Sequence, residues 1–441
     1  MDGKNLNSNY KIDPCFYEQY EVHRGLRKKD GTGVLAGLTR IGDVHGYLID
    51  EGNIIPVPGR LTYRGINVKD LINACLSEDR FGFEETAYLL LFGDLPTKEQ
   101  LDEFTQVLRK RQNLPDNFAE DVILSAPSNN IMNKLAQCVL ACYTYENMPD
   151  STDLEVVLNQ CIDLIARFPV MIAYAYQAKQ RYYEGKSLFI RMPDPALSIA
   201  ENFLHMFRQN GEYTKTEAVI LDLALILHAE HGGGNNSSFT VHVVSSTGTD
   251  TYSAISAAVG SLKGPRHGGA NAAVLDMMNE IKANVKDWAN SDEVWNYLAK
   301  IVRKEAGDGS GLIYGIGHAI YTKSDPRSEA LKSQAIILAE EKDRQAEMNL
   351  YLLVEELAPQ VFAEVKGNSK VMAANVDFFS GFVYQMLDIP EELCTPIFAM
   401  SRIVGWCAHR IDELINGGRI IRPAYRNAER LKEYVAIGER G

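Results

Sequence analysis

The order of apolar and polar positions divides the chain into a polar start, a short extended stretch and a long helical remainder. Residues 1–35 are polar and charged, which predicts an arm or short helix followed by a loop. Between residues 38 and 65, short apolar runs are broken by glycine and proline, so short strands or hairpins are expected and no large sheet. Beyond residue 65 the apolar residues recur with helical spacing. The pattern therefore predicts an all-α protein with a minor β element near its N-terminus.

The expected helices are marked both by their spacing and by their starts. Three capping boxes are predicted, at Thr97 with Gln100, Thr152 with Glu155, and Thr214 with Glu217. After the first box, one helix face collects Leu101, Phe104, Val107 and Leu108. Further helices are expected over 130–145, 154–168, 196–208, 216–229, 252–262, 270–283, 291–305, 327–341, 346–364, 378–387 and 395–416. No repeat or low-complexity segment interrupts them.

Composition and charge narrow the class of protein. The chain has 441 residues, of which 46% are hydrophobic and 23% charged, a globular composition long enough for two domains. Its net charge of −13 argues against partners such as nucleic acid or an anionic membrane. An anionic substrate would therefore require arginines gathered at one place. The seven cysteines lack any CxxC spacing, which indicates free thiols in a reducing compartment.

Targeting signals are not evident in the sequence. The N-terminal segment lacks the apolar stretch of a signal peptide and carries acidic residues, unlike a transit peptide. No apolar run is expected to be long enough to span a bilayer. A cytoplasmic location is the resulting expectation.

Candidate chemistry centres on two glycine-rich segments, which we call the first knot (228–235, HAEHGGGN) and the second knot (264–271, GPRHGGAN). Glycine allows close approach of a ligand to the backbone, and histidine transfers protons near neutral pH. The spacing between the knots predicts one buried helix, and hence a single site built from both of its ends. Taken alone, His231 could equally be a core histidine and His267 a helix cap.

Three further segments carry candidate residues. The stretch GLIYGIGHAIYTKSDPR at 311–327 contains a glycine-flanked loop before His318 and ends at Arg327. In NVDFFSG, Asp377 is flanked by apolar residues, so it is expected to be partly buried, although an N-cap role is the structural alternative. Arg402 lies within an apolar helical pattern and needs a counter-charge, whereas Arg422 near the C-terminus reads alone as a surface residue.

These motifs, in this order and spacing, resemble the citrate synthase family over nearly the whole chain. The resemblance is weakest in the first 35 residues and at 180–200. Tyr63-Arg64-Gly65 and the segment 83–101 are similar to family signatures, while Arg266 and Tyr314 depart from the usual residues. The resemblance implies a large helical domain and a smaller one that closes over a cleft. The large domain would comprise 1–268 and 386–441, and the small domain 269–385.

The resemblance also implies a role for each candidate. His267, His318 and Asp377 match catalytic residues: Asp377 as the base, His267 as donor to the thioester oxygen, His318 as donor to the oxaloacetate carbonyl. The match for oxaloacetate binding covers His231, Arg327, Arg402 and Arg422, the last reaching the partner's site in a homodimer. The match for coenzyme A binding covers Gly315, Ile316, Gly317 and Lys370. Other candidates for its phosphates are Arg27, Lys28, Lys29, Lys179 and Arg181.

The implied reaction is acyl transfer from acetyl-CoA to oxaloacetate, in which the acyl group becomes an alkyl group and the thioester is then hydrolysed. No metal or cofactor is expected, because arginines and neutral histidines would supply the electrostatic stabilisation. The nearest alternative is a 2-methylcitrate synthase that uses propionyl-CoA, since one methylene changes binding by only ~1–3 kcal/mol. A catalytically silent regulator and a helical scaffold are two further alternatives, the first opposed by Asp377, His267 and His318.

Overall fold

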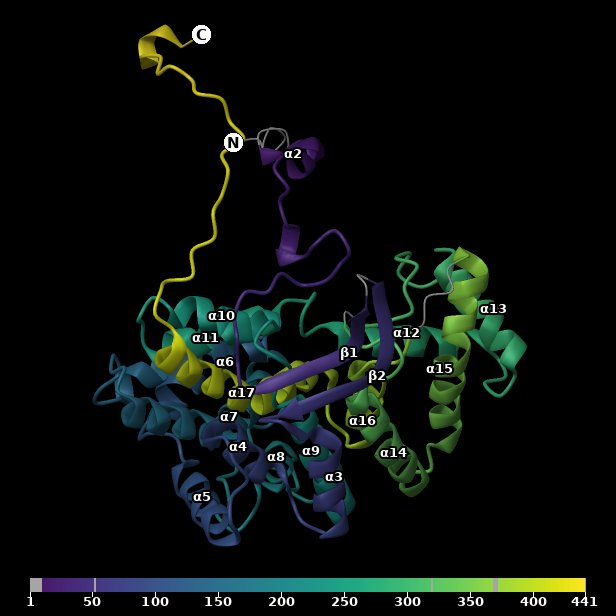
Figure 1. The fold of residues 1–441 in the computed structure, drawn as a ribbon. Helices are drawn as coiled ribbons and strands as arrows, with labels where there is room; N and C mark the ends of the chain where they lie inside the picture. Colours follow the sequence, from purple (N-terminus) through teal and green to yellow (C-terminus); the bar gives the residue numbers. More distant parts are fainter. Residues whose placement is uncertain (1–9, 51–52, 319, 368–371, 441) are drawn as a thin grey trace. The chain divides into compact units, whose positions relative to one another are not determined.

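The computed structural model describes residues 10–50, 53–318, 320–367 and 372–440 (Figure 1). It contains two compact units, one made of Met1–Leu38 with Ile420–Gly441 and the other of Thr39–Arg419. Within its described residues, the first unit holds a short helix and two single turns: α2 (Pro14–Gln19), η2 (Arg24–Leu26) and η6 (Ile437–Glu439). The second unit, the body, holds all the remaining elements. The predicted boundaries of a large and a small domain do not coincide with this division and stay a prediction.

The body is almost entirely helical, as predicted. Its helices are α3 (Val68–Ser77), α4 (Phe83–Phe92), α5 (Lys98–Arg111), α6 (Ile131–Cys142), α7 (Leu154–Tyr183), α8 (Ile199–Phe207), α9 (Lys215–His228), α10 (Asn236–Ser245), α11 (Thr251–Lys263), α12 (Ala270–Asn284), α13 (Ser291–Val302), α14 (Pro326–Glu341), α15 (Gln345–Lys366), α16 (Val376–Met386) and α17 (Cys394–Asn416). A short π-helix occurs at η3 (Ala119–Leu124), and single 3-10 turns occur at η4 (Tyr143–Tyr145) and η5 (Glu391–Leu393).

The capping residues confirm two of the three predicted boxes. Those at Thr97 and Thr214 are formed, each with a reciprocal bond to the side chain three residues later. The third is wrong, because the side chain of Asp153 caps α7 by accepting from the backbone of Glu155 and Val156. An ionised carboxylate is at least as good a helix cap as a threonine hydroxyl, and Asp153 stands one residue closer to the first turn.

The minor β element is also confirmed. Strands β1 (Gly42–Asp50), β2 (Asn53–Tyr63) and β3 (Ile66–Asn67) form an antiparallel sheet in the order β1-β2-β3. The β1–β2 register pairs Gly42 with Tyr63 and shifts between His45 and Tyr47. The shift lies beside Gly46, whose carbonyl accepts a hydrogen bond from the Thr322 hydroxyl at 3.1 Å. The hairpin therefore packs against the segment that follows His318.

The core of the body is organised around α17. Every residue from 399 to 410 is buried, although Arg402, His409 and Arg410 are among them. A helix that is buried on all sides belongs to the centre of a large helical domain. It packs against α7, α9, α10 and α11, which separate it from solvent (Figure 1). Any polar side chain on α17 must therefore find its partners within the protein or in a ligand.

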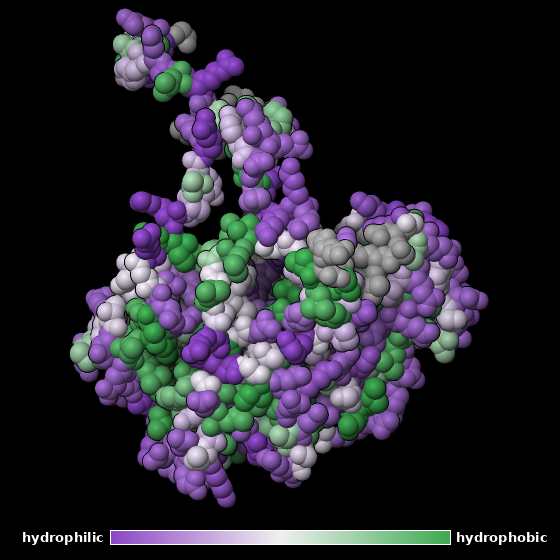
Figure 2. Space-filling view, viewed as in Figure 1, coloured by the Kyte–Doolittle hydropathy of each residue, from purple (hydrophilic) through white to green (hydrophobic). Residues whose placement is uncertain are grey.

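One helix bears on the expectation that no apolar run could span a bilayer. Helix α7 is long and apolar enough to cross a membrane by length and composition, contrary to the prediction, but 72% of its most apolar window is buried inside the protein, as in a core helix. Apolar and polar residues are mixed over the face in Figure 2.

All seven cysteines lie in the described part and have free thiols, and only Cys15 is exposed.

Candidate functional site

The two knots do meet, but two helices separate them in sequence and not one. Helix α10 begins at Asn236, just after the first knot, and α11 ends at Lys263, just before the second. The two helices pack against each other, so the start of one lies beside the end of the other. The contact is made by Ser237, which lies two residues after the first knot and whose backbone N–H donates to Nε2 of His267 at 3.3 Å. One end of this helix pair therefore brings His267 beside the residues that follow the first knot.

The hydrogen bonds around His267 place its proton. Because Nε2 accepts from the Ser237 backbone, the proton of the neutral ring belongs on Nδ1. Burial, assisted by the positive charge of Arg402, lowers the pKa of His267 to about 4, so the ring is neutral at pH 7. The N-cap of α12 is Gly269, which makes no side-chain cap, so His267 is not a capping residue. The ring is thus a neutral hydrogen-bond donor.

His318 has the opposite tautomer. Its Nδ1 accepts backbone N–H groups from Ile320 and Tyr321, each at 3.1 Å, so Nε2 carries the proton. The segment that supplies these N–H groups is fixed by the hairpin, since Gly59 N–H donates to the Ser324 hydroxyl at 3.2 Å. The short β element therefore positions a second neutral histidine donor.

An aromatic cluster joins His318 to the first knot. The ring centroids of His231 and His318 are 5.3 Å apart, and Tyr321 stacks on His318 at 4.7 Å. His231 is 9% exposed, and burial together with Arg327 lowers its pKa well below the ordinary value. Among the described residues, Nε2 of His231 and the hydroxyl of Tyr321 are buried without a hydrogen-bond partner. Tyr321 was not predicted from the sequence. Its position three residues after His318 was the signal that could have identified it.

Arg402 carries a positive charge that is fully buried in the body. Its side chain is fully buried, and its Nε donates to the carbonyl of His228 at 2.7 Å. Its Nη1 and Nη2 have no partner in the part of the chain that the structure describes. Burial lowers the pKa of Arg402 to about 10, with Glu230 opposing that shift. A buried guanidinium with two open donors is a site for a bidentate anion such as a carboxylate.

Arg327 is buried too, which excludes a surface arginine at the start of α14. It is 4% exposed and forms a bidentate ion pair with Asp325, with Nη2 at 2.8 Å from Oδ2. Burial acts to lower the pKa of Arg327, but the charge of Asp325 outweighs it and the pKa is raised. Asp325 was not predicted as a site residue, although it occupies the N-cap position before Pro326. Asp325 balances the charge of Arg327, so of these two arginines Arg402 is the one with open donors.

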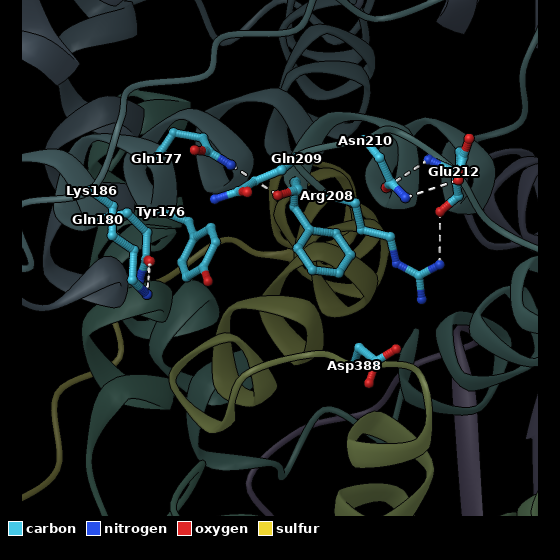
Figure 3. A pocket seen from close by; sticks show the side chains of 10 residues that line it. Tyr176, Gln177, Gln180, Lys186, Arg208, Gln209, Asn210, Glu212 and Asp388 are labelled. Carbon is cyan, nitrogen blue, oxygen red and sulfur yellow. Dashed lines mark hydrogen bonds between the residues drawn. The ribbon is translucent and has the colours of Figure 1, made fainter. Parts of the chain in front are cut away.

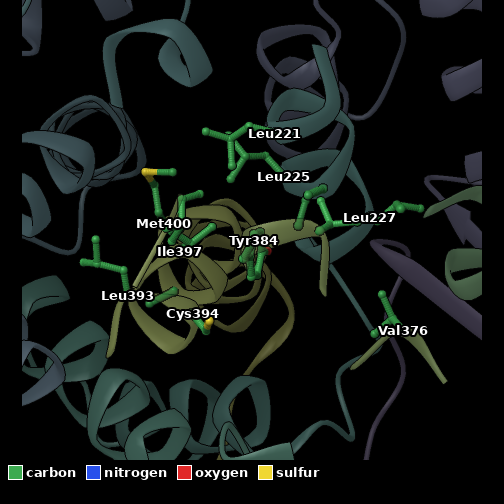
Figure 4. Close-up of a cluster of buried hydrophobic side chains, with 14 of the residues drawn as sticks. Leu221, Leu225, Leu227, Val376, Tyr384, Leu393, Cys394, Ile397 and Met400 are labelled. Atoms are coloured by element: carbon green, nitrogen blue, oxygen red, sulfur yellow. The ribbon is translucent and has the colours of Figure 1, made fainter. Parts of the chain in front are cut away.

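Asp377 is the carboxylate that the sequence predicted as the base of this group of residues. The N-cap of α16 is Asn375, whose side chain accepts from the Asp377 N–H, so the alternative role of Asp377 as a cap is excluded. Helix α16 is anchored by its buried side chains, among them Tyr384, which lies close to side chains of α9 and α17 (Figure 4). Burial raises the pKa of Asp377 to about 6, against the opposing charges of Arg327 and Arg402. The carboxylate is therefore able to accept a proton near neutral pH.

This pKa predicts a stability effect. The folded-state pKa lies above the ordinary value of 3.8, so the fold loses stability as the pH rises from about 4 to about 6, and the full cost of ionised Asp377 is present above that pH. A shift of roughly two units corresponds to about 3 kcal/mol. We expect Asp377→Asn to raise the free energy of unfolding by up to that amount at pH 8, and the gain to vanish near pH 4. Urea titrations at both pH values measure it, and an equal gain at both would contradict the assignment.

The predicted coenzyme A loop is tied to the start of α16. Gly317 N–H donates to the Ala373 carbonyl and Asn375 N–H to the Gly315 carbonyl, both at 2.8 Å, and Ile316 pairs with Ala374. Gly315 and Gly317 have φ of 79° and 102°, which other residues rarely adopt. The loop and Asp377 are thus held in a fixed relation. Much of the loop's backbone hydrogen bonding is already satisfied internally, which leaves fewer groups for a ligand than the sequence suggested.

Four other residues that the sequence analysis named remain to be placed. Lys370 lies outside the described residues. Arg422 is exposed and belongs to the unit with the chain ends. The side chain of Lys179, a candidate phosphate contact, is paired with those of Glu184 and Glu392. Arg266 is exposed and lines, with His267, an open cavity of about 480 Å³.

A second cavity, of about 550 Å³, lies apart from these residues (Figure 3). It is lined by Tyr176, Gln177, Gln180, Lys186, Phe207, Arg208, Gln209, Asn210, Glu212 and Asp388. The basic side chains in it are already engaged, Lys186 by Gln180 and Arg208 by Glu217. None of the predicted site residues lines it, so the candidate site remains the group around Arg402.

Comparison with known proteins gives a consistent result. The family described as citrate synthase, C-terminal domain, matches residues 30–424. Citrate synthase from Haloferax volcanii is 33% identical over 411 residues, covering 90% of this chain and 98% of the relative. 2-Methylcitrate synthase 1 from Corynebacterium glutamicum is 33% identical over 429 residues, covering 95% and 99%.

A solved structure agrees with these relatives. The ternary complex of carboxymethyl coenzyme A and oxaloacetate with citrate synthase from Thermoplasma acidophilum superposes with a TM-score of 0.77 at 27% identity, covering 95% of this chain and 99% of that one. The chain therefore belongs to the citrate synthase family, and its fold is that of the family.

Proposed function

We propose that this member of the citrate synthase family condenses acetyl-CoA with oxaloacetate and hydrolyses the resulting thioester to citrate and coenzyme A. The observation that carries the proposal is Arg402, a fully buried guanidinium with two donors that no described residue satisfies. Oxaloacetate is a dianion, and one of its carboxylates would accept both donors in a bidentate pair. His231, with its unpartnered Nε2, would supply a further hydrogen bond.

The proton positions support an acid–base mechanism. Asp377 removes a methyl proton of acetyl-CoA while Nδ1–H of His267 donates to the thioester oxygen, which stabilises the enol or enolate. The nucleophilic carbon then attacks the oxaloacetate carbonyl, polarised by Nε2–H of His318. Water hydrolyses the citryl thioester to release citrate and coenzyme A. In this mechanism neutral histidines and arginines stabilise the developing charge, and no metal or cofactor takes part.

A 2-methylcitrate synthase is the second candidate, favoured by relatives of that name at 32–33% identity. The two activities differ by one methylene in the acyl donor. The test is thiol release with oxaloacetate and either acetyl-CoA or propionyl-CoA. A higher kcat/KM with acetyl-CoA supports the proposal, and a higher value with propionyl-CoA supports the alternative. No thiol release with either would favour a silent regulator or a scaffold.

A homodimer in the cytoplasm is part of the proposal. Arg422 lies in a terminal segment, and its match to the family suggests that it reaches the partner's site. If so, Arg422→Ala and Asp377→Ala should each be nearly inactive alone but complement each other in mixed dimers. Refolding an equal mixture makes half of the dimers mixed, and each holds one intact site, so roughly a quarter of the sites should recover.

The control for this prediction is each variant refolded alone. Mass measurement or differential tagging shows whether mixed dimers have formed. If they have formed and the mixture stays as inactive as its parents, Arg422 does not act across the interface. If the protein stays monomeric, the dimer itself is excluded.

A further inference from the structure

A histidine pair outside the proposed cleft has an unusual arrangement. His242 on α10 and His409 on α17 face each other, with Nε2 of His242 at 3.0 Å from Nδ1 of His409. The Asp412 carboxylate lies on the same helix as His409, one turn later. The nearest ligand atoms of these three side chains all lie within 4.8 Å of one another.

Each histidine is also held by a carboxylate on its far side. Glu413 lies 2.7 Å from Nδ1 of His242, and Glu230 lies 3.1 Å from Nε2 of His409. A carboxylate only accepts, so each neutral ring must place its single proton on the nitrogen that faces its glutamate. The two nitrogens that face each other then both carry lone pairs. A contact of 3.0 Å between two lone pairs is repulsive, so these nitrogens need a cation, which is either a proton on one of the rings or a bound metal ion.

Carboxylate–histidine pairs of this kind are the usual support for a metal ion. The carboxylate fixes the tautomer and the orientation of the ring, and directs the other nitrogen to the metal. Two nitrogens bound to tetrahedral zinc lie about 3.3 Å apart, given a Zn–N distance of about 2.0–2.1 Å. The observed 3.0 Å is within a small side-chain movement of that geometry. The two histidines would supply two nitrogen ligands, Asp412 would supply one oxygen ligand, and water would be the fourth ligand.

There is also access and space for an ion. His242 and Glu413 are 14% and 12% exposed, so the pair can be reached from solvent. On the side of the first knot the neighbour is Gly233, and a Cβ there would lie 3.7 Å from Nε2 of His242 and 3.8 Å from Nδ1 of His409. Glycine at this position leaves that side of both nitrogens open.

We propose that His242, His409 and Asp412 form a binding site for a transition-metal dication of the Zn²⁺ or Co²⁺ type, supported by Glu413 and Glu230. Imidazole nitrogens with one carboxylate favour such ions over Mg²⁺, which prefers oxygen ligands. The site is linked to the proposed cleft, because Glu230 also accepts the backbone N–H of Gly232, next to His231. The ion is therefore placed to influence the cleft without taking part in the proposed reaction.

The test is metal binding by the full chain after treatment with a chelator. Titration with Co²⁺, followed by its visible absorption and by calorimetry, should show one equivalent bound, and Zn²⁺ should displace it while Mg²⁺ does not. His242→Ala and Asp412→Asn should each weaken binding at least tenfold. Glu413→Gln should weaken it about 10–100-fold. The control is His205→Ala, a histidine on α8 outside the cluster, which should bind as the wild type does.

Several results would overturn the proposal. Absence of a one-to-one Co²⁺ complex in the wild type would mean that a proton bridges the two rings instead. Unchanged affinity in both Asp412→Asn and Glu413→Gln, which change partly exposed side chains, would exclude this cluster even if His242→Ala failed to fold. Loss of binding in His231→Ala but not in His242→Ala would assign the metal to the cleft. None of these readouts depends on catalytic activity, so failure of the proposed function would leave them interpretable.

Discussion

Asp377→Asn is expected to keep the fold and to lose at least about 10²-fold in kcat, the usual contribution of a general base. The amide has nearly the same shape as the carboxylate but cannot accept the methyl proton. The wild type provides an independent check, because its pKa of about 6 requires kcat/KM to rise with pH through that value. His267, with a pKa of about 4, stays neutral over the same range and adds no second limb there.

The matched control is Asp388→Asn, just beyond the end of α16 and exposed to solvent. It changes the same functional group on the same segment and should leave kcat unchanged. The readout is thiol release at saturating oxaloacetate and acetyl-CoA, with thermal unfolding to verify the fold. A variant at position 377 with near wild-type turnover, or a wild-type profile that is flat between pH 5 and 7, would remove Asp377 from the chemistry.

Arg402→Met should abolish productive use of oxaloacetate while leaving the protein folded. Two charge-assisted hydrogen bonds at about 1.5–3 kcal/mol each would be lost, which lowers kcat/KM for oxaloacetate by about 10²–10⁴-fold. The loss of the charge should cost the free protein little stability, because methionine gives up the bond from Nε to the His228 carbonyl but also removes a buried guanidinium whose Nη atoms have no hydrogen-bond partner among the described residues. Lower affinity for oxaloacetate without lower thermal stability is the expected pair of results.

Arg410→Met is the control for burial. Arg410 lies on the same helix, is equally buried and also has two donors without a hydrogen-bond partner among the described residues, while its Nη2 donates to the carbonyl of Thr249. If both substitutions reduce kcat/KM equally, the effect belongs to the packing of α17 and not to an anion at Arg402. If Arg402→Met binds oxaloacetate as tightly as the wild type, as measured by calorimetry, the dianion site must be placed elsewhere.

Sequence patterns were informative where local chemistry decides the structure. The all-α class, the hairpin before residue 65 and the helix starts at Thr97 and Thr214 were predicted correctly, because spacing and caps are properties of neighbouring residues. Helix α10 was missed. Its sequence NSSFTVHVVS is rich in serine and β-branched residues, which favour a helix weakly. Packing between α11 and α17 stabilises it in place of intrinsic propensity.

The candidate residues themselves were named from motifs, but their physical state could not be. The pair of Asp325 and Arg327 is local, two residues apart, but no local pattern states that both are buried or that the donors of Arg402 stay open. The tautomer of His267 depends on Ser237, 30 residues earlier, and that contact exists only because α10 and α11 fold back on each other. Likewise, the facing nitrogens of His242 and His409 are 167 residues apart in sequence. Residue identity supplies the chemical groups. The tautomers of the histidines, the pKa values of the buried side chains and the unpaired donors of Arg402 depend on neighbours that the packing of distant helices brings within hydrogen-bonding distance.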